Sequence, residues 1–249
     1  MTDTSTSANT LSTSPSSNRY FFAAMSALFL LVAIIGFGPN SVAILGGSKP
    51  SPPFIVHLHA AMMSFWLLLL LTQALLKATN NLALHMRLGL CSLVFAPLMV
   101  LVMIAVTWVR YHDMSAAGLG AIASNVLMLQ IRAVLLFTMF LVWALRVRTR
   151  DGEAHKRLML LATLVLLDAA LGRMTWLPGY AMPLSYDAIH AYLLLLFAPA
   201  LVFDLLRYGR LHRTCVIGLG LLLVCMVATS LLWNHPWWLR TASTLMGTA

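Results

Sequence analysis

Long apolar runs alternate with short polar breaks along most of the chain. A helix needs about 20 mostly apolar residues to cross the hydrocarbon core of a bilayer. By that measure the sequence predicts seven spans with approximate ends: 20–38, 54–76, 87–109, 119–145, 157–177, 188–206 and 214–233. Turn-forming residues mark several breaks, such as Pro52 and Pro53 before the second span and Pro178 and Gly179 after the fifth. The predicted fold class is therefore all-α, a polytopic membrane helix bundle.

The same pattern divides the chain into three parts. Residues 1–18 are rich in Ser and Thr and bury too little apolar surface to offset the entropy of ordering, so we expect a disordered tail. Residues 19–240 are predicted to form a single transmembrane helical domain, followed by a short C-terminal tail over 241–249. The core is expected over 54–206, because spans 20–38 and 214–233 carry no membrane-embedded charge and are placed at the periphery.

The high apolar and low charged content of the chain indicates that its predicted helices are surrounded by lipid. The chain is 61% hydrophobic and 9% charged, whereas soluble domains are about 45–50% apolar and 25% charged. The net charge of +9 does not indicate nucleic acid as a partner, because the basic residues lie between apolar runs. In such positions they orient a membrane protein. The lipid bilayer is therefore the expected partner.

The distribution of basic residues predicts the orientation. Eleven lie on one side of the predicted spans: Arg19, Lys77, Arg87, Arg146, Arg148, Arg150, Lys156, Arg157, Arg207, Arg210 and Arg213. The other side has only Lys49, Arg110, Arg173 and Arg240. Because positive charge accumulates on the cytoplasmic side, the N-terminus is expected to be cytoplasmic and the C-terminus outside. We expect a multi-pass protein of a bacterial inner (plasma) membrane.

Histidines near both membrane faces suggest a cofactor. His59 and His190 lie near the outer ends of their spans, and His85 and His155 near the inner ends of theirs. A di-haem cytochrome b needs one such pair near each face, because each haem b iron takes two imidazoles from facing helices. Arg173 would meet the outer propionates, and Arg87, Lys156 or Arg157 the inner ones.

Simpler interpretations of these histidines remain open. A histidine beside Arg and Lys at a helix end is more often an interfacial residue than a ligand. A copper site of His59, His190 and Met62 or Met63 is a further alternative, since imidazole and thioether suit copper.

Two charges fall near the middle of the predicted membrane. Arg132 and Asp168 each lie about a dozen residues inside a span, which at about 1.5 Å per residue is near the midplane of a core about 30 Å thick. A lone charge at that depth is costly, so the two are predicted to form a buried ion pair or a water-bridged link. Gln130 or Asn125 would be further hydrogen-bond partners. The pair either serves function or only sets the helix register.

Several short motifs resemble those of a protein group. These are His85-Met86-Arg87-Leu88-Gly89, His155-Lys156-Arg157-Leu158-Met159, Asp168-Ala169-Ala170-Leu171-Gly172-Arg173, and His57-Leu58-His59-Ala60 followed by Trp66 and Gln73. Together they resemble uncharacterised bacterial multi-span families described only as predicted membrane proteins, over roughly residues 55–205. The resemblance implies a membrane protein of unestablished function. A looser resemblance to di-haem b-type membrane cytochromes rests on histidine placement alone.

The leading hypothesis is an integral inner-membrane protein that binds b-type haem. It would exchange electrons with quinone or with another redox membrane protein. The alternatives are a proton-coupled or small-molecule transporter centred on Arg132 and Asp168, and a non-catalytic membrane assembly subunit.

Overall fold

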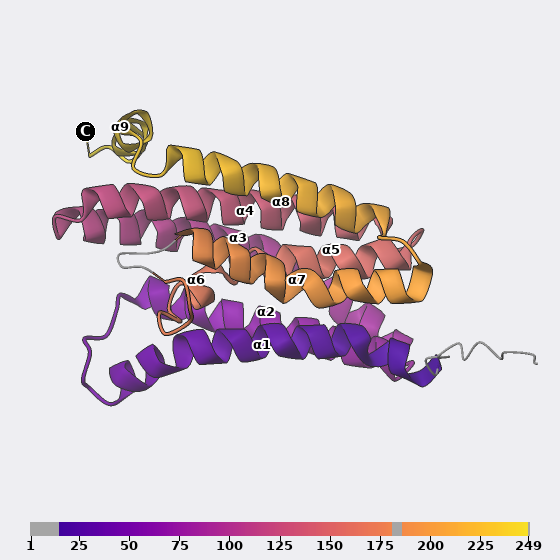
Figure 1. Ribbon diagram of the computed structural model, residues 1–249. Coiled ribbons are helices and arrows are strands. Elements are labelled where there is room, and N and C mark those ends of the chain that lie inside the picture. Colours follow the sequence, from indigo (N-terminus) through magenta and orange to yellow (C-terminus); the bar gives the residue numbers. More distant parts are fainter. Residues whose placement is uncertain (1–14, 181–185, 249) are drawn as a thin grey trace, which may run out of the picture.

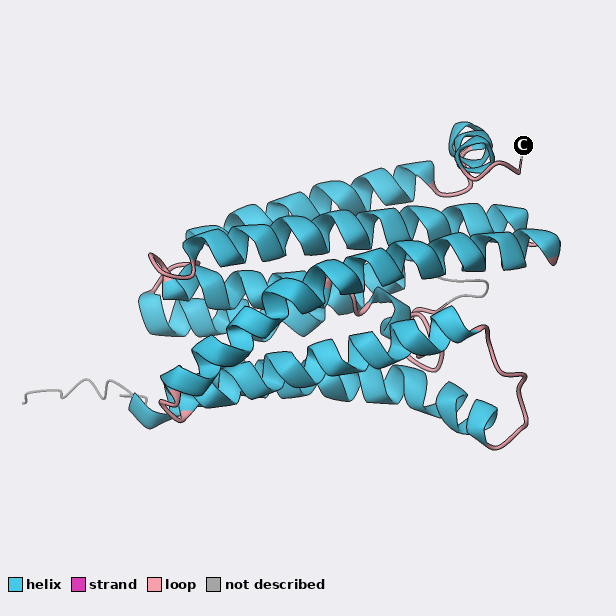
Figure 2. Ribbon diagram, turned by 180° about the vertical axis from the view of Figure 1, so that it is seen from behind, coloured by secondary structure: helices cyan, strands magenta, loops and turns pink. Residues whose placement is uncertain are grey.

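A computed structural model describes residues 15–180 and 186–248 of the 249-residue chain, and the side chains from residue 19 onwards. Over these ranges the chain is all-α and contains no strand (Figures 1 and 2). The helices are α1 (Pro15–Leu45), α2 (Phe54–Ala78), α3 (Leu82–Ala116), α4 (Gly120–Val147), α5 (Gly152–Leu164), α6 (Asp168–Leu171), α7 (Tyr186–Tyr208), α8 (Arg213–Leu232) and α9 (Pro236–Leu245).

The long helices run side by side and form a bundle, with α9 lying across one end (Figure 1). In the described part of the chain, six helices are long and apolar enough to cross a membrane: α1 from Arg19, α2, α3, α4, α7 and α8. Large apolar side chains such as Leu206 and Leu231 point away from the bundle, as they do where the surroundings are lipid. The protein is therefore a multi-pass integral membrane protein.

The predicted continuous helix over 157–177 is wrong. α5 ends at Leu164, and the four-residue α6 begins at Asp168. Between them the amides of Leu166 and Leu167 bond to the carbonyls of Thr163 and Leu164, at 3.1 and 3.0 Å. These are i→i−3 bonds, which tighten the chain into a 3₁₀ turn. The fifth predicted span is thus a divided helix, and among the described residues six of the approximately seven predicted spans are long apolar helices.

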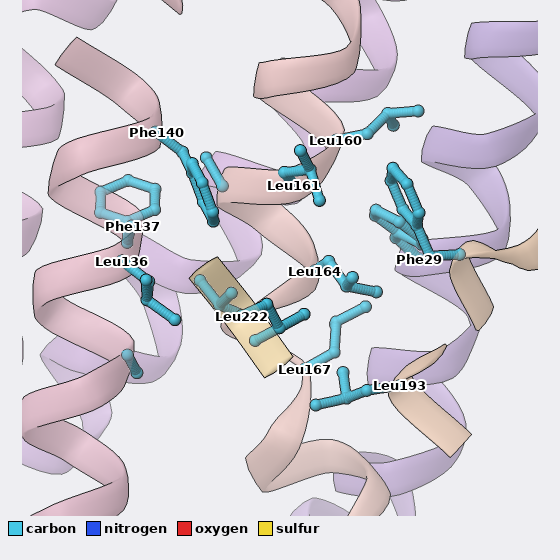
Figure 3. Packing of buried hydrophobic residues seen from close by; sticks show 14 of the residues in the cluster. Phe29, Leu136, Phe137, Phe140, Leu160, Leu161, Leu164, Leu167, Leu193 and Leu222 are labelled. Atoms are coloured by element: carbon cyan, nitrogen blue, oxygen red, sulfur yellow. The ribbon is translucent and has the colours of Figure 1, made fainter. Parts of the chain in front are cut away.

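α5 lies in the centre of the bundle. Its four leucines, Leu158, Leu160, Leu161 and Leu164, are all buried. Figure 3 shows Leu161 and Leu164 between Phe137 and Phe140 on one side and Phe29 on the other. This central packing holds the divided helix in place.

The two outer helices α1 and α8 also contribute to the core. α1 packs on α5 and α6, and α8 packs on α5. Phe29 of α1 and Leu222 of α8 are both 0% exposed. The closest approaches are at glycines: a Cβ at Gly36 would lie 2.5 Å from the carbonyl oxygen of Ala170, and one at Gly218 would clash with a terminal methyl group of Leu161.

The ends of the membrane domain differ from those predicted. α1 begins at Pro15, so residues 15–18 of the predicted tail are helical, and residues 1–14 lie outside the described part. At the other end, α9 continues through residues 241–245 of the predicted C-terminal tail. α9 is held by Trp238, whose indole Nε1 donates to the Ser124 carbonyl at 2.9 Å, and by Ala242, which is 0% exposed.

Candidate functional site

Four polar side chains meet in the interior of the bundle, and we call them the Arg132 cluster. They come from three helices: Arg132 from α4, Asp168 from α6, and Tyr186 and His190 from α7. Arg132 Nη2 forms an ion pair with Asp168 Oδ2, and Nη1 donates to the Tyr186 hydroxyl and lies 2.6 Å from His190 Nε2. All four residues are at most 8% exposed, so their interactions are little weakened by solvent.

The geometry defines the protonation of His190. A guanidinium has only donors, so the contact from Arg132 Nη1 requires an acceptor lone pair on His190 Nε2. The imidazole is therefore neutral and carries its proton on Nδ1. The Tyr186 hydroxyl also lies within hydrogen-bonding distance of the same Nε2. Tyr186 and His190 are four residues apart, which places them on one face of α7.

The cluster keeps one donor and one acceptor unused. Arg132 Nε and Asp168 Oδ1 are both buried and have no hydrogen-bond partner among the described residues. An unpaired buried polar group costs about 1–3 kcal/mol and calls for an explanation. The two atoms belong to the partners of one ion pair, so a small polar molecule could be held by both sides of it.

The divided helix positions Asp168. This residue is the first of α6 and directly follows the 3₁₀ turn. Behind it, Gly36 allows α1 to approach the α6 backbone at Ala170, and the Tyr180 hydroxyl donates to the Leu171 carbonyl at 2.7 Å. The carboxylate that pairs with Arg132 therefore lies on a short segment whose backbone is held from two directions.

Sequence reasoning missed Tyr186 and misassigned Asn125. Arg132 bonds to Asp168, Tyr186 and His190, and neither Gln130 nor Asn125 is among its partners. Asn125 instead bonds to Asn234 in the turn before α9, at 2.6 and 3.1 Å. The spacing of Tyr186 and His190 on one helix face is the signal that could have identified Tyr186.

The expected outer haem ligands do not form a free pair. His190 Nε2 is engaged by Arg132 and Tyr186. His59 lies on α2, and its Nδ1 is buried without a hydrogen-bond partner among the described residues. Arg173 donates from Nη1 to the Ala169 carbonyl at 2.5 Å, and its guanidinium lies 4.5 Å from the centroid of the Phe37 ring.

The inner histidines have a different environment. His85 Nδ1 lies 3.2 Å from the Gln73 carbonyl oxygen, and His155 Nδ1 lies 3.0 Å from the Ala144 carbonyl oxygen. A carbonyl only accepts, so each Nδ1 carries the proton and each Nε2 keeps its lone pair. This tautomer is the one in which imidazole binds a metal through Nε2.

Arg157 lies in a second buried ion pair that the sequence did not predict. Its Nε donates to the two Asp204 carboxylate oxygens at 3.0 and 3.1 Å, and Nη1 donates to Glu153 Oε2 at 2.7 Å. Arg157 and Asp204 are 1% and 0% exposed. Burial raises the pKa of Glu153, but the hydrogen bonds from Lys156 and Arg157 outweigh this effect and hold the pKa below its ordinary value. Arg157 is therefore not free for a haem propionate.

Within residues 15–180 and 186–248, no three His, Cys, Asp or Glu side chains gather closely enough to hold a metal ion. The groups of the Arg132 cluster can donate and accept hydrogen bonds and bind a proton.

No family model matches the chain, and no match is found among curated proteins or solved structures. The fold defines the class, an all-α multi-pass integral membrane protein. Any finer function has to be argued from the residues themselves.

Proposed function

We propose that this membrane protein is a proton-coupled carrier of small polar solutes, centred on Arg132 and Asp168. The observation that carries the proposal is a buried ion pair with an unused donor and acceptor, located where a helix is divided. Ionisable residues inside a membrane bundle mark substrate or proton pathways by default. Transporters commonly bind their substrates at discontinuous helices near the midplane.

The transport cycle would begin with protonation of the Asp168 carboxylate. A proton added to its carboxylate removes the negative charge and weakens the ion pair with Arg132, whose guanidinium then needs a new partner. A solute with an acceptor group would take that place, beside the hydroxyl of Tyr186 and the neutral ring of His190. When the proton leaves, the ion pair forms again and displaces the solute. The 3₁₀ turn before Asp168 provides the hinge for this change.

The test uses the full chain in vesicles loaded with the pH-sensitive dye pyranine. A potassium gradient with valinomycin drives protons inwards while a mixture of small polar solutes is supplied outside, and acidification is compared for wild type, Asp168→Asn and Asp187→Asn. Asp187 is a matched control, because it is an exposed carboxylate on α7 that accepts from Ser230 at 3.3 Å.

We expect wild type and Asp187→Asn to acidify the vesicles at equal rates, and Asp168→Asn to match protein-free vesicles. Equal rates for wild type and Asp168→Asn, or no flux above protein-free vesicles for wild type, would contradict the proposal.

A second candidate is a b-type haem between the inner histidines. The outer pair does not fit, because His190 Nε2 is engaged within the Arg132 cluster. His85 and His155 fit the role of axial ligands, because each ring contacts a backbone carbonyl through Nδ1 and keeps the lone pair of Nε2 to bind iron. Bound haem would supply one-electron chemistry, with quinone or a redox membrane protein as the partner.

The absorption spectrum of detergent-purified protein from haem-supplemented cells tests this candidate. A Soret band that disappears in His85→Ala and His155→Ala but persists in His57→Ala would support it. A colourless wild-type protein would rule it out.

A further inference from the structure

A hollow of about 760 Å³ lies at the end of the bundle where α9 crosses. Residues at the end of α3, at the start of α4, on α9 and just after α9 line it. The lining comprises Tyr111, His112, Ser115, Ala116, Gly120, Ala121, Ser124, Leu239, Arg240, Ser243 and Thr248. This hollow is separate from the Arg132 cluster, since the two share no residue.

The chemistry of the lining favours an anion. Five lining residues carry hydroxyl groups, one carries an imidazole and one, Arg240, a guanidinium, whereas none carries a carboxylate. No ion pair involves Arg240 in the part of the chain that the structure describes. The nearby carboxylate of Asp113 is already neutralised by Arg110, at 3.2 Å.

Two polar atoms of the lining have no protein partner. His112 Nε2 and Ser115 Oγ are buried and make no hydrogen bond to any described residue. The hollow also includes Gly120 and Ala121, the first residues of α4, and the preceding Leu119 provides no side-chain cap. The first amides of a helix have no partner within it, so their N–H groups add to the donors on this side.

We propose that this hollow binds a phosphate group, carried either by a lipid headgroup or by a soluble phosphate compound. A guanidinium matches phosphate with two parallel hydrogen bonds, and the unpartnered Ser115 hydroxyl and the helix-start amides supply further donors. α9 carries exposed large apolar side chains, with Trp237 53% and Leu245 62% exposed, a composition typical of helices that lie at a membrane surface. This site is independent of the proposed carrier function.

The experiment uses the full chain purified in detergent and two probes. Calorimetry measures the binding of inorganic phosphate, and native mass spectrometry counts bound short-chain phosphatidylglycerol. Both are compared for wild type, Arg240→Gln, Ser115→Ala and Arg210→Gln. Arg210 is a matched control, because it is exposed, lies at the opposite end and forms no ion pair in the described structure.

We expect Arg240→Gln to weaken binding about tenfold or more, as loss of a charged hydrogen-bond partner does, and Ser115→Ala to weaken it less. Arg210→Gln should bind as wild type does. If inorganic phosphate binds and the variants change its affinity in this order, the site takes soluble phosphate groups. If only phosphatidylglycerol binds, with the same order of variants, the site takes a lipid headgroup. If neither probe binds, or if Arg240→Gln and Arg210→Gln behave alike, the proposal is overturned.

Discussion

The guanidinium of Arg132 on α4 is paired with the carboxylate of Asp168 at the first residue of α6, inside the bundle. Arg132→Leu or Asp168→Leu alone should lower the free energy of unfolding by about 3–5 kcal/mol, because each leaves a buried charge unpaired. The double variant should lose much less, because neither charge of the pair is then left without its partner. Denaturant unfolding in detergent micelles measures the three values. Additive losses in the double variant would show that the residues do not interact.

The contact of Gly36 with Ala170 gives a second prediction. A Cβ at Gly36 meets backbone atoms of α6 at 2.5–2.8 Å, which cannot move aside as a side chain can. Gly36→Ala should therefore lower the free energy of unfolding by about 1–3 kcal/mol, the usual range for overpacking. Gly38→Ala is the matched control, because open space surrounds that position. If thermal unfolding shows equal midpoints for both variants, the close approach of α1 and α6 is wrong.

The third prediction concerns pH. Hydrogen bonds from Lys156 and Arg157 lower the pKa of Glu153 below its ordinary value of 4.5. The resulting stabilisation is fully present above the unfolded pKa and is lost as the pH falls from about 4.5 through the folded value. Glu153→Gln should therefore reduce the dependence of the unfolding midpoint on pH below about 5. Identical pH curves for wild type and Glu153→Gln would exclude this contribution.

The fourth prediction is topological. The turns over residues 148–151 and 209–212, which contain Arg148, Arg150 and Arg210, lie at one end of the bundle. The C-terminus lies at the other end (Figure 1). Positive charge favours the cytoplasm for the first end. An alkaline phosphatase fused after residue 249 should be active, and one fused after residue 150 inactive. The reverse pattern would invert the orientation.

The sequence was sufficient to predict the all-α fold class and the ion pair between Arg132 and Asp168. Hydropathy reports the length of each apolar run, and the depth of a charge follows from its distance to the end of a helix. The division of the fifth span could not be predicted, since residues 164–168 contain neither Gly nor Pro. A 3₁₀ turn in a leucine-rich segment depends on its tertiary contacts, here those of a segment packed between α1 and α8.

The partners of Arg132 were predictable only in part. Depth alone makes Asn125, Gln130 and His190 plausible neighbours of Arg132, because depth does not determine how each helix is rotated about its axis. The structure selects His190 and adds Tyr186. Likewise, Asp204 and Arg157 were each visible in the sequence, but their pairing depends on the contact between α5 and α7.

The central claim is that the Arg132–Asp168 pair carries protons rather than only setting the helix register. Arg132→Leu combined with Asp168→Leu separates the two roles, because this double variant is expected to fold yet has no proton-binding carboxylate. The decisive measurement is proton uptake into pyranine-loaded vesicles by this variant, once its unfolding midpoint shows that it is folded. The carrier account predicts no uptake beyond that of protein-free vesicles. Uptake at the wild-type rate would contradict it and leave the pair a structural role only.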